Sequence, residues 1–99
     1  MAKHDVHLAL DGRGYLLDVQ TDLLSGIDTR VVVPLLPQPF RAIPVRRLNP
    51  VFRIGDTEHV MATQFLVAIP ARLLKAPVTS LGAETSAIAD ALDMLLQGF

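Results

Sequence analysis

The spacing of the apolar residues changes once along this chain, near residue 83. Before that point, short apolar stretches alternate with polar residues and are separated by Gly and Pro, which is typical of β-strands joined by turns. After it, apolar residues recur at helical spacing, at Ile88, Ala91, Leu92 and Leu95. We expect this helix over residues 83–97, with an N-cap at Thr79 or Ser80 and Gly98 as its C′ residue. A run of strands followed by one helix predicts a mainly β or α+β fold rather than an alternating α/β fold.

Several extended segments are predicted before the helix. Residues 5–10 alternate, and the turn Asp11-Gly12-Arg13-Gly14 joins them to a second strand over Tyr15–Gln20, which makes a hairpin. The run Arg30–Leu36 has no polar alternation, so we expect it at the centre of a sheet, with Pro34 marking a bend or bulge. Further extended segments are expected at Ala42–Val45, Val51–Ile54, His59–Thr63 and Phe65–Ile69.

The chain has more apolar residues than one small core can use. It is 51% hydrophobic over 99 residues, whereas a domain of this size buries only about 60% of its unfolded surface. Prolines and polar residues interrupt the apolar stretches before they reach the roughly 18 residues of a membrane span. We therefore expect a homodimer, the alternative being a monomer with an apolar surface.

Charge and cysteine content exclude several functions. The formal net charge is −1, which is incompatible with broad phosphate binding, so no direct nucleic-acid contact is expected. The absence of cysteine excludes thiolate catalysis and sulfur-ligated zinc, and it fits a cytoplasmic location, as does the lack of an export signal. His4, His7 and His59 lack metal-ligand spacing and are expected at solvated strand positions. We predict no metal, no cofactor, no membrane contact and no catalytic residue.

Three features favour contacts with other proteins. Arg41, Arg46 and Arg47 form the one cluster of like charge, either a solvated edge or a docking surface for an acidic partner. The chain ends in Leu95-Leu96-Gln97-Gly98-Phe99 without a polar tail, so Phe99 either folds into the core or is displayed to a partner. The Leu23-Leu24 pair, in a loop, presents the same two alternatives.

Taken together, five blocks of this sequence resemble the CcdB family, the toxins of bacterial toxin–antitoxin modules. They occur in the family's order over almost the whole chain. The blocks are Leu17–Leu24 (LDVQTDLL), Arg30–Leu35 (RVVVPL), Leu48–Val51 (LNPV), Ile54–Asp56 (IGD) and the helix that ends in Gly98 and a large apolar residue.

The resemblance implies a fold and a mode of action. The expected fold is a five-stranded antiparallel sheet continued by a small three-stranded sheet, a partly open barrel with one C-terminal helix. Family members are two-fold dimers and not enzymes. The dimer inserts into the opened A subunit of DNA gyrase and traps the gyrase with its DNA cleaved, and an acidic antitoxin (CcdA-like) removes it.

The resemblance also implies which residues make these contacts. The gyrase-facing residues would be Leu23, Leu24, Asp93, Leu96, Gln97, Gly98 and Phe99. The antitoxin-facing residues would be Arg13, Arg41, Arg46 and Arg47. The family ends in Trp-Gly-Ile, and Gln97 replaces the indole, which removes a cation–π contribution of roughly 0.5–2 kcal/mol, about two- to thirty-fold in affinity.

Two other functions stay open at this point. The fold is compatible with a protein that no longer poisons gyrase and only binds its antitoxin or regulates. It is also compatible with an endoribonuclease like MazF, in which Arg30, Arg53 or Arg72 would have to converge to stabilise a phosphorane.

Overall fold

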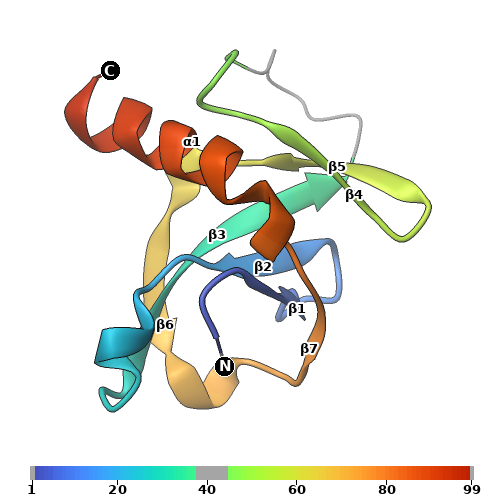
Figure 1. The fold of residues 1–99 in the computed structure, drawn as a ribbon. Coiled ribbons are helices and arrows are strands. Elements are labelled where there is room, and N and C mark those ends of the chain that lie inside the picture. Colours follow the sequence, from blue (N-terminus) through green and yellow to red (C-terminus); the bar gives the residue numbers. More distant parts are fainter. Residues whose placement is uncertain (1, 38–44, 99) are drawn as a thin grey trace.

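The computed structural model describes residues 2–37 and 45–98 and contains a curled antiparallel sheet with one helix across it (Figure 1). The strands are β1 Asp5–Leu8, β2 Tyr15–Asp18, β3 Thr29–Pro37, β4 Val51–Ile54, β5 Thr57–Met61, β6 Val67–Pro70 and β7 Pro77–Ser80. The helix α1 spans Thr85–Gln97, and short 3-10 turns are η1 Asp22–Leu24, η2 Thr63–Phe65, η3 Ala71–Leu73 and η4 Gly82–Glu84. The predicted α+β class, with strands first and one helix last, is confirmed.

Strand β3 is long enough to belong to two parts of the sheet. Together with β7, β1, β2 and β6 it forms a five-stranded part, in which Thr29–Val32 pairs with β6. Its last residues, Leu35–Pro37, pair with β5, which pairs with β4, and this makes a three-stranded part. The five-plus-three arrangement implied by the family resemblance is therefore confirmed, with β3 shared between the two parts. The predicted segment Ala42–Val45 lies outside the described residues except for Val45.

Proline is tolerated inside β3 because of where its neighbours end. The Pro34 carbonyl accepts from the Ala62 N–H at 2.9 Å, so the ring nitrogen faces the same side, between β6 and β5. No ladder bond is required there. On the other side β3 stays in register with β2, as Leu16 pairs with Pro34 and Leu17 with Val33. Of the expected bend or bulge at Pro34, the bulge is therefore absent from the β2–β3 ladder, and the proline marks the change of partner from β6 to β5.

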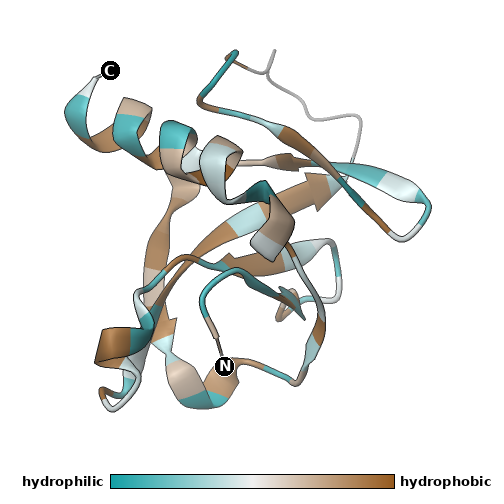
Figure 2. Cartoon of the chain, viewed as in Figure 1, coloured by the Kyte–Doolittle hydropathy of each residue, from teal (hydrophilic) through white to brown (hydrophobic). Residues whose placement is uncertain are grey.

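The helix α1 covers one face of the sheet and closes the main core. Ile88 and Ala91 are buried there against Val6, Leu17 and Val33, and Figure 2 shows apolar residues of α1 turned toward the sheet. Burying side chains of this kind supplies roughly 1.5–3 kcal/mol each. Gly98 adopts φ 81° and its N–H bonds to the carbonyls of Asp93 and Met94, so the predicted C-terminal cap is confirmed.

The start of α1 differs from the prediction. Ser80 Oγ accepts from the Gly82 N–H at 3.1 Å, a local bond that precedes η4 and caps neither η4 nor α1. The helix proper begins at Thr85, and Glu84 stands at its N-cap position without a side-chain cap bond. The expected N-cap at Thr79 or Ser80 is therefore wrong, because the 3-10 turn η4 separates both residues from the helix.

The other face of the sheet is also buried, because the five-stranded part curls into a half-barrel. His7 is fully buried on this side, and its Nδ1 donates to the Lys75 carbonyl at 2.6 Å. His4 and His59 are buried as well. The expectation of solvated histidines is wrong, because strand alternation gives one wet face only in a flat sheet. Here the residues after η3 cover His7, the Tyr15 ring packs on His59, and His4 lies beside α1.

Candidate functional site

A short turn holds the most exposed apolar side chain of the described chain. Leu23 and Leu24 lie in η1, with Leu23 93% exposed and Leu24 47% exposed. Ile27 follows and is also exposed. We call residues 21–27 the leucine turn. Thr21 begins it, because its Oγ1 accepts from the Leu23 N–H at 3.3 Å. The predicted exposure of the leucine pair is confirmed.

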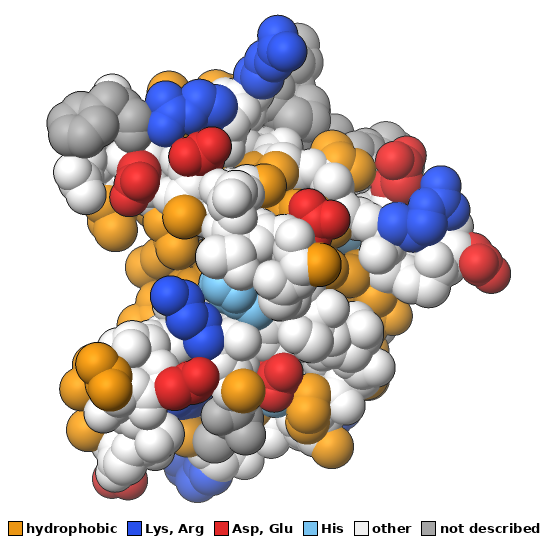
Figure 3. All heavy atoms as spheres, viewed as in Figure 1, with side chains coloured by type: hydrophobic (Ala, Val, Ile, Leu, Met, Phe, Trp, Pro, Cys, Tyr) orange, Lys and Arg blue, Asp and Glu red, His pale blue; other side chains and the backbone are white. Residues whose placement is uncertain are grey.

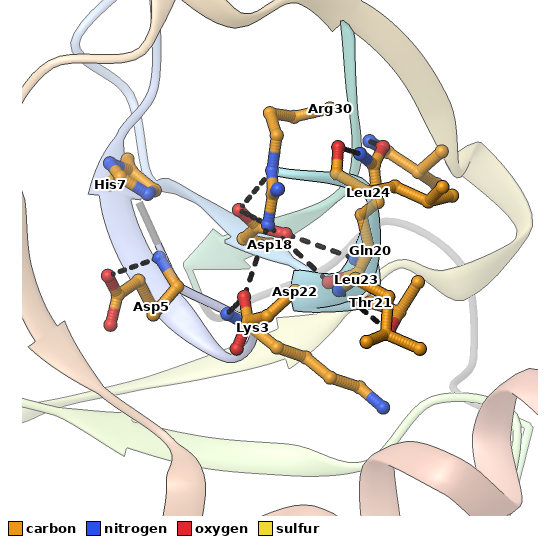
Figure 4. Close-up of polar contacts among 12 residues, drawn as sticks. Lys3, Asp5, His7, Asp18, Gln20, Thr21, Asp22, Leu23, Leu24 and Arg30 are labelled. Atoms are coloured by element: carbon orange, nitrogen blue, oxygen red, sulfur yellow. Dashed lines mark hydrogen bonds and ion pairs between the residues drawn. The ribbon is translucent and has the colours of Figure 1, made fainter. Parts of the chain in front are cut away.

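A buried ion pair lies beneath the leucine turn (Figure 4). The Arg30 guanidinium contacts Asp18 Oδ2 through Nη2 at 2.7 Å and through Nε at 2.8 Å. Both side chains are almost fully buried inside the half-barrel. The second carboxylate oxygen of Asp18 accepts from the Gln20 N–H at 3.0 Å. The carboxylate is thus paired and hydrogen-bonded on both oxygens, as a buried charge requires.

Gln20 and Asp22 connect this pair to the turn and to the N-terminus. The Gln20 side chain accepts from the Val31 N–H at 3.0 Å and donates to the Leu24 carbonyl at 3.3 Å. Asp22 Oδ1 accepts from the Lys3 N–H at 2.9 Å and lies 3.8 Å from Arg30 Nη2. The block LDVQTDLL therefore combines a buried polar network with the exposed leucines that this network supports.

Sequence reasoning missed this network. The sequence places Asp18 in a block that resembles the family and Arg30 among the arginines that a ribonuclease could use, and neither feature predicts that the two side chains pair. A signal was available, because Arg30 opens the apolar run predicted to be buried, and a buried arginine needs a partner of opposite charge. Asp18 lies within the strand predicted over Tyr15–Gln20.

The arginines considered for ribonuclease chemistry lie on separate elements. Arg30 is enclosed in its ion pair, Arg53 lies on the edge strand β4 and donates to the Asp56 carbonyl at 3.4 Å, and Arg72 lies on η3. A phosphorane needs free donors aimed at one point, and the Arg30 guanidinium is already committed to Asp18. Within the described residues there is also no group of three His, Cys, Asp or Glu side chains placed to hold a metal ion.

The end of α1 presents the second set of predicted contact residues. Asp93, Gln97 and Gly98 are exposed, and Leu96 is 69% exposed. Phe99, the last residue of this set, lies outside the described residues. The last turn of the helix therefore offers a polar and apolar surface to solvent.

The leucine turn and the end of α1 lie apart within one chain. In Figure 1 they occupy opposite ends of β6, which runs between them along one side of the molecule. Phe65 and Val67, at the start of β6, are exposed too. Figure 3 shows this side hollowed, with hydrophobic side chains inside the hollow. The predicted contact residues thus lie in two places, the leucine turn and the end of α1, and not in one patch. We call the exposed apolar residues from one end to the other the apolar strip: Leu23, Leu24, Phe65, Val67 and Leu96.

Arg13 lies at the tip of the β1–β2 hairpin, between two glycines of positive φ. The turn is closed by the Asp11 carboxylate, which accepts from the Arg13 N–H at 2.9 Å. A groove of about 370 Å³ opens beside it. Its lining is mostly apolar and includes Leu10, Leu16, Leu36, Val67 and Ile69.

Arg46 and Arg47 lie elsewhere, in the turn that precedes β4, and Arg47 reaches α1. The Arg47 Nη2 donates to the Asp90 carbonyl at 3.5 Å, and the residue adopts φ 72°. Buried Asn49 holds this segment, because its side chain accepts from the Val45 N–H at 2.9 Å and donates to the Met61 carbonyl at 3.0 Å. The segment therefore adjoins α1, and the structure does not bring it together with Arg13. Arg41 lies outside the described residues.

His4 joins the N-terminal segment to α1 and carries a pH dependence. Its N–H donates to the Asp18 carbonyl at 2.7 Å, and its Nδ1 lies 3.4 Å from Thr85 Oγ1. Burial lowers the pKa of His4 below its usual 6.5, and the Lys3 cation lowers it further, against the opposing carboxylates of Asp18 and Asp22.

This lowered pKa predicts a loss of stability in acid. A histidine whose pKa is lower in the folded state opposes folding when protonated, so its stabilisation is complete above the unfolded pKa and is lost as the pH falls through the folded one. We expect the stability of the wild type, relative to a His4→Asn variant, to decrease from about pH 7.5 to about pH 5. Urea unfolding across that range measures it, and a difference that stays constant would contradict the prediction.

In residues 2–37 and 45–98, no helix is both long and apolar enough to span a membrane. A family model described as CcdB protein matches residues 3–98 of the 99-residue chain. The match includes the buried network, both ends of the apolar strip up to Gly98, and the Arg13 hairpin. The chain therefore belongs to the CcdB family, the toxins of toxin–antitoxin modules.

Proposed function

We propose that this protein is a toxin that acts by binding, as a homodimer that engages the A subunit of DNA gyrase and traps the cleaved complex. The observation that carries the proposal is the exposed apolar strip, with Leu23 93% exposed at one end and Leu96 69% exposed at the other. Exposed apolar strips of this kind mark protein interfaces. Family membership, together with the enclosure of Arg30, favours binding over catalysis.

We expect a second copy of the chain to pack on the middle of the apolar strip and bury it. Phe65 in η2 and Val67 in β6 are both exposed, and leaving both in water forfeits the free energy of their burial. A two-fold dimer packed on this side places two helix ends and two leucine turns around one axis. The gyrase-facing surface is then continuous across the dimer although it is divided within each chain.

The leucines carry the largest share of the proposed gyrase contact. Gln97 offers an amide and no aromatic ring, so the contact at the end of α1 depends on Leu96 and on hydrogen bonds from Gln97. Asp93 and Gly98 flank them on the same turn. Apolar anchors surrounded by polar groups are the usual composition of an interface centre and its rim.

The antitoxin-facing residues form two separate surfaces. Arg13 adjoins an apolar groove, and Arg46 and Arg47 adjoin α1. An acidic antitoxin segment long enough to reach both surfaces would cover the helix that faces gyrase. This arrangement supports competition between antitoxin and gyrase for the same toxin.

Trapped cleavage complexes test the proposal directly. Purified gyrase and supercoiled plasmid, denatured after incubation with this protein, should yield linear DNA. A Leu96→Ser variant should reduce it by about tenfold or more, because an anchor side chain at an interface centre contributes about 1.4 kcal/mol or more.

Val78→Ser is the matched control, since Val78 is also exposed but lies on the edge strand β7, at the opposite edge of the five-stranded part from β6. It should leave trapping unchanged. Sedimentation of the wild type should give twice the monomer mass of 10.8 kDa. No linear DNA from a folded dimer that still binds antitoxin would overturn gyrase poisoning and favour the antitoxin-binding alternative.

A further inference from the structure

We infer that Gln20 is a positioning residue for target binding, which holds the leucine turn in its binding-competent shape; this rests on the proposed function. Gln20 is buried directly after β2, so it contacts no partner itself. Its amide reaches from the sheet to the turn. The inference rests on the two hydrogen bonds of that amide, one to Val31 in β3 and one to Leu24 in the leucine turn.

The Gln20 side chain links a rigid element to an exposed one. Oε1 accepts from the Val31 N–H in β3 at 3.0 Å, and Nε2 donates to the Leu24 carbonyl at 3.3 Å. These partners also fix the amide orientation, because the backbone N–H requires an acceptor and the carbonyl requires a donor. Of the ordinary polar side chains, only an amide of this length satisfies both at once.

The base of this link is itself held in place. The Gln20 N–H donates to Asp18 at 3.0 Å, and the Arg30 guanidinium donates to the Gln20 carbonyl at 3.4 Å. Asp18 and Arg30 are paired to one another in the barrel interior. Gln20 therefore ties the leucine turn to the buried ion pair, because its backbone bonds to the pair and its side chain bonds to the turn.

Core packing does not order the leucine turn, because no residue of η1 is buried. The Thr21 cap and the bond from the Lys3 N–H to Asp22 order its start. Its end is ordered at the Leu24 carbonyl, which accepts from the Ile27 N–H within the turn and from the Gln20 amide, and the amide is the bond that ties this end to the sheet. A turn that is ordered before binding loses less conformational entropy when the target is bound. The bond from the Gln20 amide to the Leu24 carbonyl would strengthen target binding in this way.

Gln20→Glu separates the positioning role from support of the sheet. The carboxylate keeps an acceptor for Val31, but it has no donor for the Leu24 carbonyl and repels it. We expect faster hydrogen exchange at the amides of residues 23–27 and roughly 3- to 10-fold weaker binding to the gyrase A subunit, the factor that one hydrogen bond contributes. Ile54→Val, which trims a core residue of the remote β4–β5 hairpin, controls for a general loss of stability.

A double-mutant cycle makes the inference falsifiable. If Gln20 acts through the turn, Gln20→Glu should have no further effect on binding in a Leu23→Ser/Leu24→Ser background, whereas a general structural effect would persist there. Unchanged exchange at residues 23–27 in Gln20→Glu would overturn the inference whether or not gyrase binds. Wild-type protein that fails to bind gyrase would overturn the proposed function, and the exchange measurement would still decide whether Gln20 holds the turn.

Discussion

Replacing Asp18 with Ala is expected to lower the free energy of unfolding by about 3–5 kcal/mol. The substitution removes the one carboxylate that touches Arg30 at bonding distance, and the guanidinium is then left almost fully buried with its charge uncompensated. It also removes the acceptor of the Gln20 N–H. Asp22 lies 3.8 Å from Arg30 and is itself largely exposed, so it offers only a weak substitute.

Two matched variants identify the cause of that loss. Asp18→Asn keeps the size of the side chain and an acceptor oxygen, so it isolates the loss of charge and should be less destabilising than Ala. Replacing both partners, as in Asp18→Leu/Arg30→Met, should recover part of the stability, because the cost of a buried unpaired charge disappears. Urea unfolding measures all three. If the free energy of unfolding of Asp18→Ala lies within about 1 kcal/mol of the wild-type value, another group must compensate the charge of Arg30.

Local signals in the sequence predicted the individual elements well. The Asp-Gly turn marked the first hairpin, the Val31-Val32-Val33 run marked the central strand β3, and apolar spacing marked α1. Each of these signals depends on a few neighbouring residues, and contacts with segments distant in the sequence do not override it. The strand expected at Phe65–Ile69 begins later, at Val67, because the preceding residues form a 3-10 turn against α1.

Closure of the half-barrel could not be predicted from the same signals. It depends on β6, η3 and β7 returning the chain to β1, over connections whose sequences indicate only turns or short extended pieces. The burial of His7 and the pairing of Asp18 with Arg30 follow from that closure. They were missed because alternation along one strand does not reveal whether another element covers its second face.

The candidate site was predictable residue by residue but not as a surface. Leu23 and Leu96 are exposed as expected, since loop position and the polar side of the helix are local properties. Their separation at the two ends of β6 is a property of the fold, as is the contact of Arg47 with α1 and not with Arg13. Sequence proximity of Arg46 and Arg47 to Arg41 gave no information on which element they adjoin.

Replacing Gly14 with Ala is expected to destabilise the protein by about 2–5 kcal/mol. Gly14 has φ 82°, where a side chain costs about 1–2 kcal/mol. In addition, a Cβ at this position would collide with the Leu35 carbonyl oxygen, a backbone atom of the central strand. The hairpin can relieve this contact only by moving away from β3, which weakens the β2–β3 ladder and displaces Arg13.

Gly12→Ala is the matched control for Gly14→Ala. Gly12 has nearly the same φ, 76°, but a Cβ there meets no atom within 4 Å, so only the backbone cost of about 1–2 kcal/mol applies. The difference between the two variants in urea unfolding therefore measures the close approach of the hairpin to β3. Gly14→Ala should also weaken antitoxin binding more than Gly12→Ala does, because it displaces the Arg13 groove. Equal loss of stability in the two variants would show that the hairpin does not rest against the Leu35 carbonyl in solution.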